Sequence, residues 1–299
     1  MTKMKSISVK KVTQFLNHIR KRPKKQVRDI VFRLVFGEDR EALLQLYNLM
    51  NGTDYSDASD LQIVTLESAI YVTWKNDVAF VFSGTINLYE HQSTINPNMP
   101  VRFLIYLAKE YQSYIDNSPK SIYGESLIKL PTPKFVVFYN GVKDWSGDKI
   151  QRLSDAFSNT DVESDIDVTV KVVDIKYDPD NRIVNGCEKL RQYSLFVKAV
   201  NDFRSIYDSP EDSINAAIDY CIENGVLEDI LRKHRSEVLG SFLEEFDKEK
   251  YENTLKSDAE ERARNELLLT LVNEGNLDLD VAVAKAGVDK EVFESWLNK

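Results

Sequence analysis

Apolar residues recur at helical spacing over residues 27–50, which predicts a helix with one buried face and a break near Phe36-Gly37. A second helix is predicted from Pro100, a residue suited to the first helical position, to about residue 115. From residue 187 onward the pattern is almost entirely helical. The predicted helices there cover about 187–207, 210–224 and 228–264, and three short amphipathic segments broken at Gly275 and Gly287 lie in 267–297.

Between these helices, the pattern changes to alternation and to short apolar runs, which are typical of strands. Extended elements are predicted at 61–72, 76–93, 134–139 and 167–175. The second of these is a hairpin, because runs rich in Val, Ile, Phe and Tyr flank Ser83-Gly84, and Gly suits a tight turn. The order of elements predicts an α/β or α+β core, with a mixed sheet flanked by helices and a helical C-terminal region.

The hairpin predicts a specific geometry. A turn centred on Ser83-Gly84 pairs residues whose numbers sum to 167, so that Asp77 faces Glu90 with Cβ atoms roughly 5 Å apart. Side chains alternate along a strand, so Gln92 shares the face of Glu90, and Lys75 lies opposite Gln92. A turn longer by one residue would move Lys75 to the other face.

Two carboxylates at this separation repel each other unless they share a proton or a cation. Asp77 and Glu90, with the amide of Gln92, offer the oxygen ligands that Mg²⁺ prefers. The pattern therefore predicts a divalent metal site on the hairpin.

Further side chains extend the candidate site as accessory residues. Glu67 is either a third acid near the metal or a surface carboxylate. Arg102 and Tyr106 are four positions apart on a predicted helix and share a face. Arg102 either reaches a phosphate near the acids or pairs with Glu90 or another carboxylate, and the sequence leaves both open.

Composition indicates a globular protein, since 299 residues with 42% hydrophobic content can bury a large core. The apolar runs are far shorter than the ~20 residues that cross a bilayer. Two distant cysteines, Cys187 and Cys221, provide neither a disulfide framework nor a cysteine metal cluster. We expect a cytoplasmic protein with no membrane segment.

Charge is distributed unevenly. The net charge is −9, yet residues 1–28 contain ten Lys or Arg and no Asp or Glu, so the remainder has a net charge of −19. The basic segment is either a contact for a polyanion such as DNA or a solvated tail. Its densest part, and the candidate nucleic-acid contact, consists of Lys21, Arg22, Lys24 and Lys25.

These patterns divide the chain into four parts. They are a basic N-terminal arm (1–26), a core (27–185), a helical extension (186–264) and a small helical tail (265–299). The tail has the small-residue turn of a helix-turn-helix. Its second helix carries Asp289, Glu291 and Glu294, which oppose contact with phosphates.

The hairpin and the following helix also carry a resemblance. Asn-Asp-Val at 76–78, a turn, Tyr-Glu-His-Gln-Ser at 89–93 and Met-Pro-Val-Arg-x-x-x-Tyr at 99–106 resemble the PD-(D/E)XK nuclease superfamily. More narrowly, the chain resembles the recombination-promoting nuclease (Rpn) or putative transposase branch, over most of residues 25–245. The resemblance implies a restriction-endonuclease-like core and a DNA endonuclease that depends on Mg²⁺ or Mn²⁺. It leaves a homodimer open.

The same resemblance implies roles for individual residues. Asp77 and Glu90 would be metal ligands, and the backbone carbonyl of His91 would complete the shell. Gln92 would replace the usual lysine of the superfamily in orienting the attacking water, without the lysine's positive charge. Lys75 is a candidate to return that charge. The alternative interpretation is a non-catalytic relative that binds DNA or a protein partner.

Overall fold

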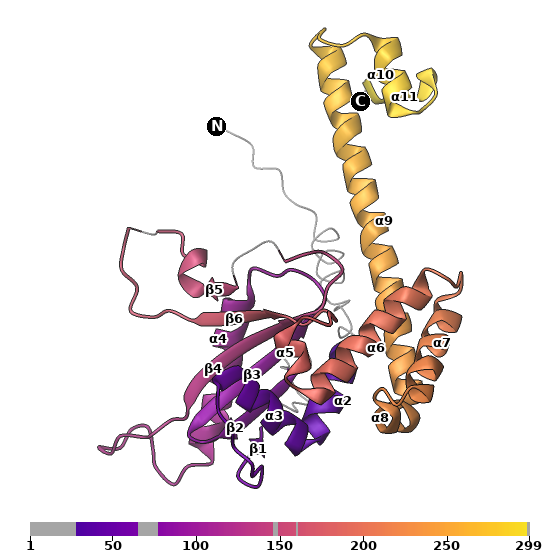
Figure 1. Cartoon of the computed structure of the whole chain (residues 1–299). Coiled ribbons are helices and arrows are strands. Elements are labelled where there is room, and N and C mark those ends of the chain that lie inside the picture. The colour runs from indigo at the N-terminus through magenta and orange to yellow at the C-terminus, as the bar shows by residue number, and fades with distance from the viewer. Residues whose placement is uncertain (1–27, 65–76, 146–148, 160, 298–299) are drawn as a thin grey trace. The chain divides into compact units, whose positions relative to one another are not determined.

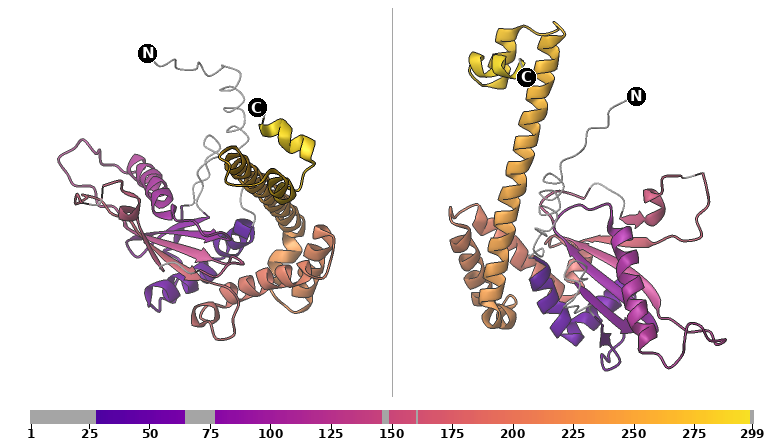
Figure 2. Two further views of the ribbon diagram at one scale, coloured as in Figure 1. Left: turned by 90° about the horizontal axis from the view of Figure 1, so that it is seen from above. Right: turned by 180° about the vertical axis from the view of Figure 1, so that it is seen from behind.

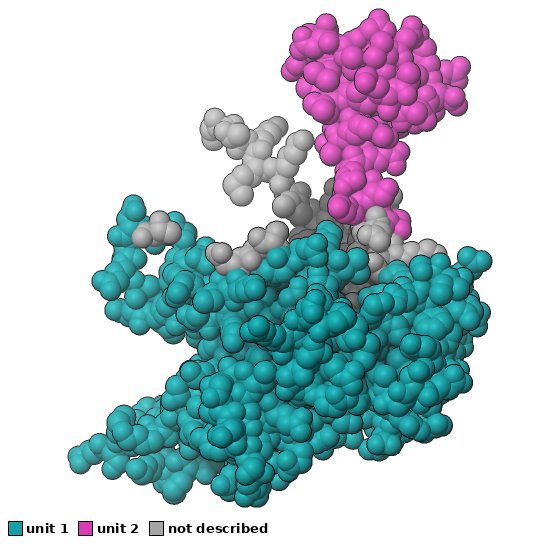
Figure 3. Space-filling model, viewed as in Figure 1, with its two compact units in different colours: residues 1–243 teal, residues 244–299 magenta. Residues whose placement is uncertain are grey.

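The computed structural model describes residues 28–64, 77–145, 149–159 and 161–297 (Figure 1). The basic arm, Glu67 and Lys75 lie outside these ranges. The chain divides into two compact units, residues 1–243 and 244–299, which Figure 3 shows in different colours. The predicted four-part division stays a prediction. Among the described residues, no helix is both long enough and apolar enough to cross a bilayer.

The first unit contains one mixed sheet of six strands in the order β1-β2-β3-β4-β6-β5. Strands β1, β2 and β3 are antiparallel neighbours, β3, β4 and β6 run parallel, and β5 is antiparallel to β6. The mixed α/β sheet is therefore confirmed. The strands are β1 (Gln62–Ile63), β2 (Val78–Phe82), β3 (Thr85–Gln92), β4 (Thr132–Tyr139), β5 (Ile150–Arg152) and β6 (Thr169–Asp174).

Helices cover both faces of this sheet (Figure 2). Leu88 on β3 packs in a buried cluster with Phe103 of α4 (Met99–Asp116). The next residues in alternation, Tyr89 and His91, point to the opposite face, where Phe32 of α2 lies with its ring centroid 5.9 Å from that of His91. The helices of this unit are α2 (Arg28–Glu38), α3 (Arg40–Asn51), α4 (Met99–Asp116), α5 (Arg182–Asn185), α6 (Glu188–Arg204), α7 (Pro210–Glu223), α8 (Glu228–Lys233) and the first part of α9 (Arg235–Asn273).

The predicted hairpin register is confirmed. Val78 pairs with Tyr89 and Phe82 with Thr85, so the paired numbers sum to 167. Ser83 and Gly84 have φ angles of 47° and 71°, which is the pattern of a type I′ turn. The two-residue turn leaves no room for a shifted register, and it places the first residues of β2 beside the last residues of β3.

We expect Gly84→Ala to lower the free energy of unfolding by about 1 kcal/mol, because an L side chain at positive φ brings its Cβ against the backbone. Gly37→Ala in α2 is the matched control, since at neither position does an added Cβ come within 4 Å of an atom outside the adjacent backbone. That control should raise stability by about 0.5–1 kcal/mol through helix propensity. Urea unfolding followed by circular dichroism measures both changes. Shifts of the same sign would contradict the assignment of the turn.

Helix boundaries differ from the prediction at two places. The break in the first helix lies at Asp39 rather than at Phe36-Gly37, because the Asp39 side chain accepts a hydrogen bond from the backbone N–H of Ala42 (2.9 Å) and starts α3. The helix predicted over 228–264 is two helices, with α8 ending before His234. The short elements β5 and α5 were not predicted. Of the extended segment predicted at 61–72, β1 falls within the described residues.

The second unit contains the rest of α9, followed by α10 (Leu279–Ala286) and α11 (Lys290–Leu297). The predicted breaks at Gly275 and Gly287 are confirmed, with φ angles of 72° and 71°. These positive angles end the preceding helices at residues that lack a Cβ. Leu268, Ala282, Ala286 and Phe293 form a small buried cluster.

Candidate metal and catalytic site

Asp77, directly before β2, and Glu90, near the end of β3, lie together as the hairpin register predicts. The backbone N–H of Asp77 donates to Oε2 of Glu90 (3.3 Å). In return, Oδ2 of Asp77 accepts the backbone N–H of His91 (2.7 Å). Both side chains are buried, with 7% of Asp77 and 2% of Glu90 exposed. The two carboxylates are therefore held side by side through bonds to the backbone.

The backbone N–H and carbonyl of His91 face the side of β3 on which Asp77 lies. In a strand, the N–H and C=O of one residue point to the same side, and those of the next residue point to the other side. The His91 N–H reaches Asp77, whereas the Gln92 carbonyl oxygen accepts from Asn140 at the end of β4 (3.0 Å). The His91 carbonyl is thus directed toward the side of β3 on which Asp77 lies. Its imidazole instead packs against Phe32 and Tyr193 on the opposite face of the sheet.

Gln92 is 1% exposed, and neither its Oε1 nor its Nε2 has a hydrogen-bond partner among the described residues. Leaving a buried polar group unsatisfied costs about 1–3 kcal/mol. Such groups are uncommon and are found where a water, an ion or a ligand binds. Because side chains alternate along a strand, Gln92 lies on the same sheet face as Glu90, two residues further along β3.

Arg102 in the first turns of α4 completes the cluster. Its Nη2 donates to Oε1 of Glu90 in a close ion pair, and its Nε and Nη2 donate to the hydroxyl of Tyr106 (3.1 and 2.9 Å). A cation near a helix N-terminus opposes the helix dipole. Arg102 is therefore held there by Glu90 and Tyr106. Of the two interpretations that the sequence allows, pairing with Glu90 is the one observed.

The site raises the pKa of three of its groups, Glu90, Arg102 and Tyr106. Burial, and then the neighbouring charge of Asp77, raise the pKa of Glu90 well above the usual value for a carboxyl group. Burial, the largest single cause, would lower the pKa of Arg102, but Glu90, Tyr106 and Asp77 together outweigh it and raise that pKa. Burial and the Glu90 charge raise the pKa of Tyr106, so its hydroxyl stays protonated at neutral pH. Glu90 thus lies in a setting that favours either a proton or additional positive charge.

The donor set fits a hard divalent cation. Asp77 and Glu90 supply carboxylate oxygens, His91 directs a carbonyl toward them, and the Gln92 amide oxygen has no partner among the described residues. Mg²⁺ takes such oxygen ligands and usually keeps several waters. No group of three or more His, Cys, Asp or Glu side chains with metal-binding geometry occurs within the described ranges. A metal here would therefore depend on two carboxylates together with carbonyl, amide and water oxygens.

The structure adds Asn140 and Gly141 to the site. Asn140 is 4% exposed at the end of β4 and bonds the Gln92 backbone. A Cβ at Gly141 would come within 2.3 Å of the carbonyl oxygen of Ser93, so only glycine fits this approach of two loops. The Asn-Gly pair directly after a buried strand was the available signal, and it predicted only the end of the strand.

Four predicted nucleic-acid contacts, Lys21, Arg22, Lys24 and Lys25, lie outside the described residues.

Comparison with known proteins identifies one family. A family model described as putative transposase, YhgA-like, matches residues 26–216, which is more than half of the chain. No curated protein and no solved structure shows a significant match. The matched range contains all six strands of the sheet and every residue of the site described above.

Proposed function

Because this chain belongs to the YhgA-like putative transposase family, we propose that it is a Mg²⁺-dependent DNA endonuclease with a PD-(D/E)XK core. The observation that carries the proposal is the pairing of Asp77 and Glu90 through reciprocal backbone hydrogen bonds, beside the Gln92 amide, which has no hydrogen-bond partner among the described residues. The order of two helices, three antiparallel strands, a helix and a parallel strand supports the same core. DNA is the proposed substrate.

In this proposal Asp77, Glu90 and the His91 carbonyl hold the metal. When bound, Mg²⁺ (or Mn²⁺) supplies Lewis-acid stabilisation of a phosphoryl group and lowers the pKa of a coordinated water. The Gln92 amide, which can both donate and accept, orients the attacking water. Glutamine carries no charge, so it does not neutralise charge on the phosphate as a lysine would.

Arg102 is proposed to supply that missing positive charge. Its guanidinium has several donors, and about a quarter of its side chain is exposed although it contacts Glu90. It can therefore bind Glu90 and still present an N–H to a phosphate oxygen. Tyr106 keeps the guanidinium in place through two hydrogen bonds. Lys75 and Glu67 stay accessory candidates from the sequence.

One observation favours the alternative of a non-catalytic, DNA- or protein-binding relative. Glu90 is 2% exposed and already engaged by Arg102, so its negative charge is balanced within the protein. A bound metal stabilises a site whose charge is already balanced less than it stabilises a pair of carboxylates without a cation. The alternative predicts no Mg²⁺ binding and retained, salt-sensitive DNA binding.

The test is incubation of the full-length protein with supercoiled plasmid. We expect open-circular product with Mg²⁺, none with excess EDTA, and recovery of nicking when Mg²⁺ is added back, because the metal supplies the charge that stabilises the transition state. Agarose gels with time points measure the rate. Equal nicking in EDTA would contradict metal dependence, and DNA binding without nicking would support the non-catalytic alternative.

A further inference from the structure

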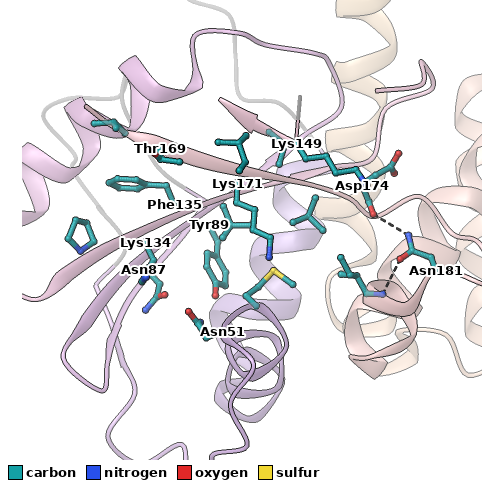
Figure 4. Close-up of a pocket in the computed structure, with 18 of the residues that line it drawn as sticks. Asn51, Asn87, Tyr89, Lys134, Phe135, Lys149, Thr169, Lys171, Asp174 and Asn181 are labelled. Carbon is teal, nitrogen blue, oxygen red and sulfur yellow. Dashed lines mark hydrogen bonds between the residues drawn. The ribbon is translucent and has the colours of Figure 1, made fainter. Parts of the chain in front are cut away.

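A cavity lies on the sheet face opposite α4, apart from the Asp77–Glu90 site. It has a volume of about 980 Å³ and is bounded by β3, β4 and β6, by the end of α3 and by α5 with its preceding loop (Figure 4). Pockets that bind small molecules usually measure about 300–1,000 Å³. Every part of this cavity belongs to the first unit.

Two lysines of the central strands face this cavity. Phe135 and Val137 of β4, and Val170 and Val172 of β6, pack in the cluster under α4. By alternation, Lys134 and Lys171 project from the opposite face, and both line the cavity. Val136 pairs with Lys171, which places the two lysines on neighbouring strands two positions apart in register. Neither has an ion-pair partner among the described residues.

The cavity also contains a buried amide with an unused acceptor. Asn87 is fully buried, and its Nδ2 donates to Oγ1 of Thr85 (2.9 Å). Its Oδ1 has no hydrogen-bond partner within the part of the chain that the structure describes. Asn51 at the end of α3 and the hydroxyl of Tyr89 line the same region (Figure 4). A ligand group that donates a hydrogen bond to Oδ1 of Asn87 would remove the free-energy cost of burying that oxygen without a partner.

The opposite wall is acidic and rigid. Asp178 and Asp180 are exposed beside the cavity, and Asn181 between them and α5 is fixed at both ends of its side chain. Its Oδ1 accepts from the backbone N–H of Ile183 (3.1 Å), and its Nδ2 donates to the Asp174 carbonyl (3.1 Å), as the dashed lines in Figure 4 mark. The acids would repel a continuous phosphate backbone, so a discrete ligand suits the cavity better than a DNA strand.

We propose that this cavity binds a nucleoside monophosphate. Lys134 and Lys171 bind the phosphate as charged donors. The amides of Asn51 and Asn87 bind the polar edge of the base, and the acids accept hydrogen bonds from the sugar hydroxyls. The cavity faces away from Asp77 and Glu90, so this binding is independent of the proposed nuclease activity.

The test is isothermal titration calorimetry of the full-length protein with AMP, GMP, CMP and UMP, and with inorganic phosphate for comparison. We expect saturable binding of at least one nucleotide, tighter than that of phosphate. Lys171→Gln should weaken this binding about tenfold or more, because it removes one charge-assisted contact. Lys120→Gln, an exposed lysine outside the cavity, is the matched control and should bind as wild type does.

Further variants and competitors test whether nucleotide binding is independent of the Asp77–Glu90 site and specific to this cavity. Asp77→Asn should retain nucleotide binding, which separates failure of this inference from failure of the proposed nuclease function. Absence of saturable binding to all four nucleotides would overturn the proposal, as would binding no tighter than that of phosphate. Unchanged affinity in both Lys171→Gln and Lys134→Gln would overturn it too. Displacement of the nucleotide by duplex DNA in wild type, but not in Lys171→Gln, would reassign the cavity as a DNA contact.

Discussion

Asp77→Asn is expected to abolish Mg²⁺-dependent nicking of supercoiled plasmid while the fold is retained. Asparagine keeps a side-chain oxygen that can accept the His91 N–H, the bond that now measures 2.7 Å to Oδ2 of Asp77. The substitution removes the negative charge that the proposed metal requires. A loss of at least about a hundredfold in nicking rate follows from weakened metal binding and lost charge stabilisation.

The matched control for this substitution is Asp144→Asn. Asp144 is an almost fully exposed acid that pairs with Lys176 (2.6 Å) rather than with the candidate site. It should nick DNA at the wild-type rate. Circular dichroism checks that Asp77→Asn is folded, and calorimetric titration with Mg²⁺ checks that metal binding is lost with the activity. Wild-type nicking by folded Asp77→Asn would remove the basis for the proposed site.

Arg102→Gln is expected to produce the largest loss of stability. Arg102 contacts Glu90, whose side chain is 3% exposed, and its removal leaves that carboxylate buried beside Asp77 without its cation. Removing one partner of a fully buried ion pair costs about 3–5 kcal/mol. Since a quarter of the Arg102 side chain is exposed, solvent reduces the loss, and we expect about 2–4 kcal/mol. Urea unfolding followed by circular dichroism measures it.

Two controls make this prediction specific. Arg191→Gln removes an exposed pair with Glu188 (2.6 Å) and should cost less than about 1 kcal/mol. Adding Glu90→Gln to Arg102→Gln should recover part of the loss, because the unpaired charge is then absent. Equal losses for Arg102→Gln and Arg191→Gln would contradict the structural role given to the buried pair.

The decrease in the free energy of unfolding caused by Arg102→Gln should also depend on pH. Burial and the Asp77 charge raise the pKa of Glu90, and Arg102 is the largest of the interactions that lower it, so its removal raises this pKa further although hydrogen bonds from the Asp77 backbone and Tyr106 remain. A carboxyl group whose pKa is raised on folding binds more protons in the native state, so stability falls as pH rises above the pKa of the unfolded chain. The variant should therefore lose more stability at about pH 8 than at about pH 5. The opposite slope would show that Glu90 keeps its charge by another contact.

Much of the hairpin could be predicted from sequence because its determinants are local. The Ser83-Gly84 turn sets which residues pair, and alternation then sets which side chains share a face. Both rules act over a few residues, so the sequence alone predicts Asp77 beside Glu90, as the structure has it. The helix break was less well predicted, because the cap at Asp39 competes with the Phe36-Gly37 interruption and provides a hydrogen bond.

The partner of Arg102 could not be predicted from the sequence. Its spacing from Tyr106 is a local property and was recognised, yet its partner depended on how α4 packs on β3. Burial then decided the electrostatics, since the pKa of Glu90 is raised mainly by loss of solvent, which the sequence does not record. The Gln92 amide, which has no hydrogen-bond partner in the described part of the chain, is likewise a result of packing, because the positions of the surrounding atoms decide which polar groups find partners.

By itself, the sequence determined the family, the mixed α/β architecture and the facing carboxylates, because periodicity, turn chemistry and short motifs are encoded in neighbouring residues. The tertiary structure alone decided the Arg102–Glu90 pair, the approach of Asn140 to Gln92 and the cavity with Lys134 and Lys171. Parallel strands such as β4 and β6 are joined by long connections, so no local rule sets which of their side chains become neighbours.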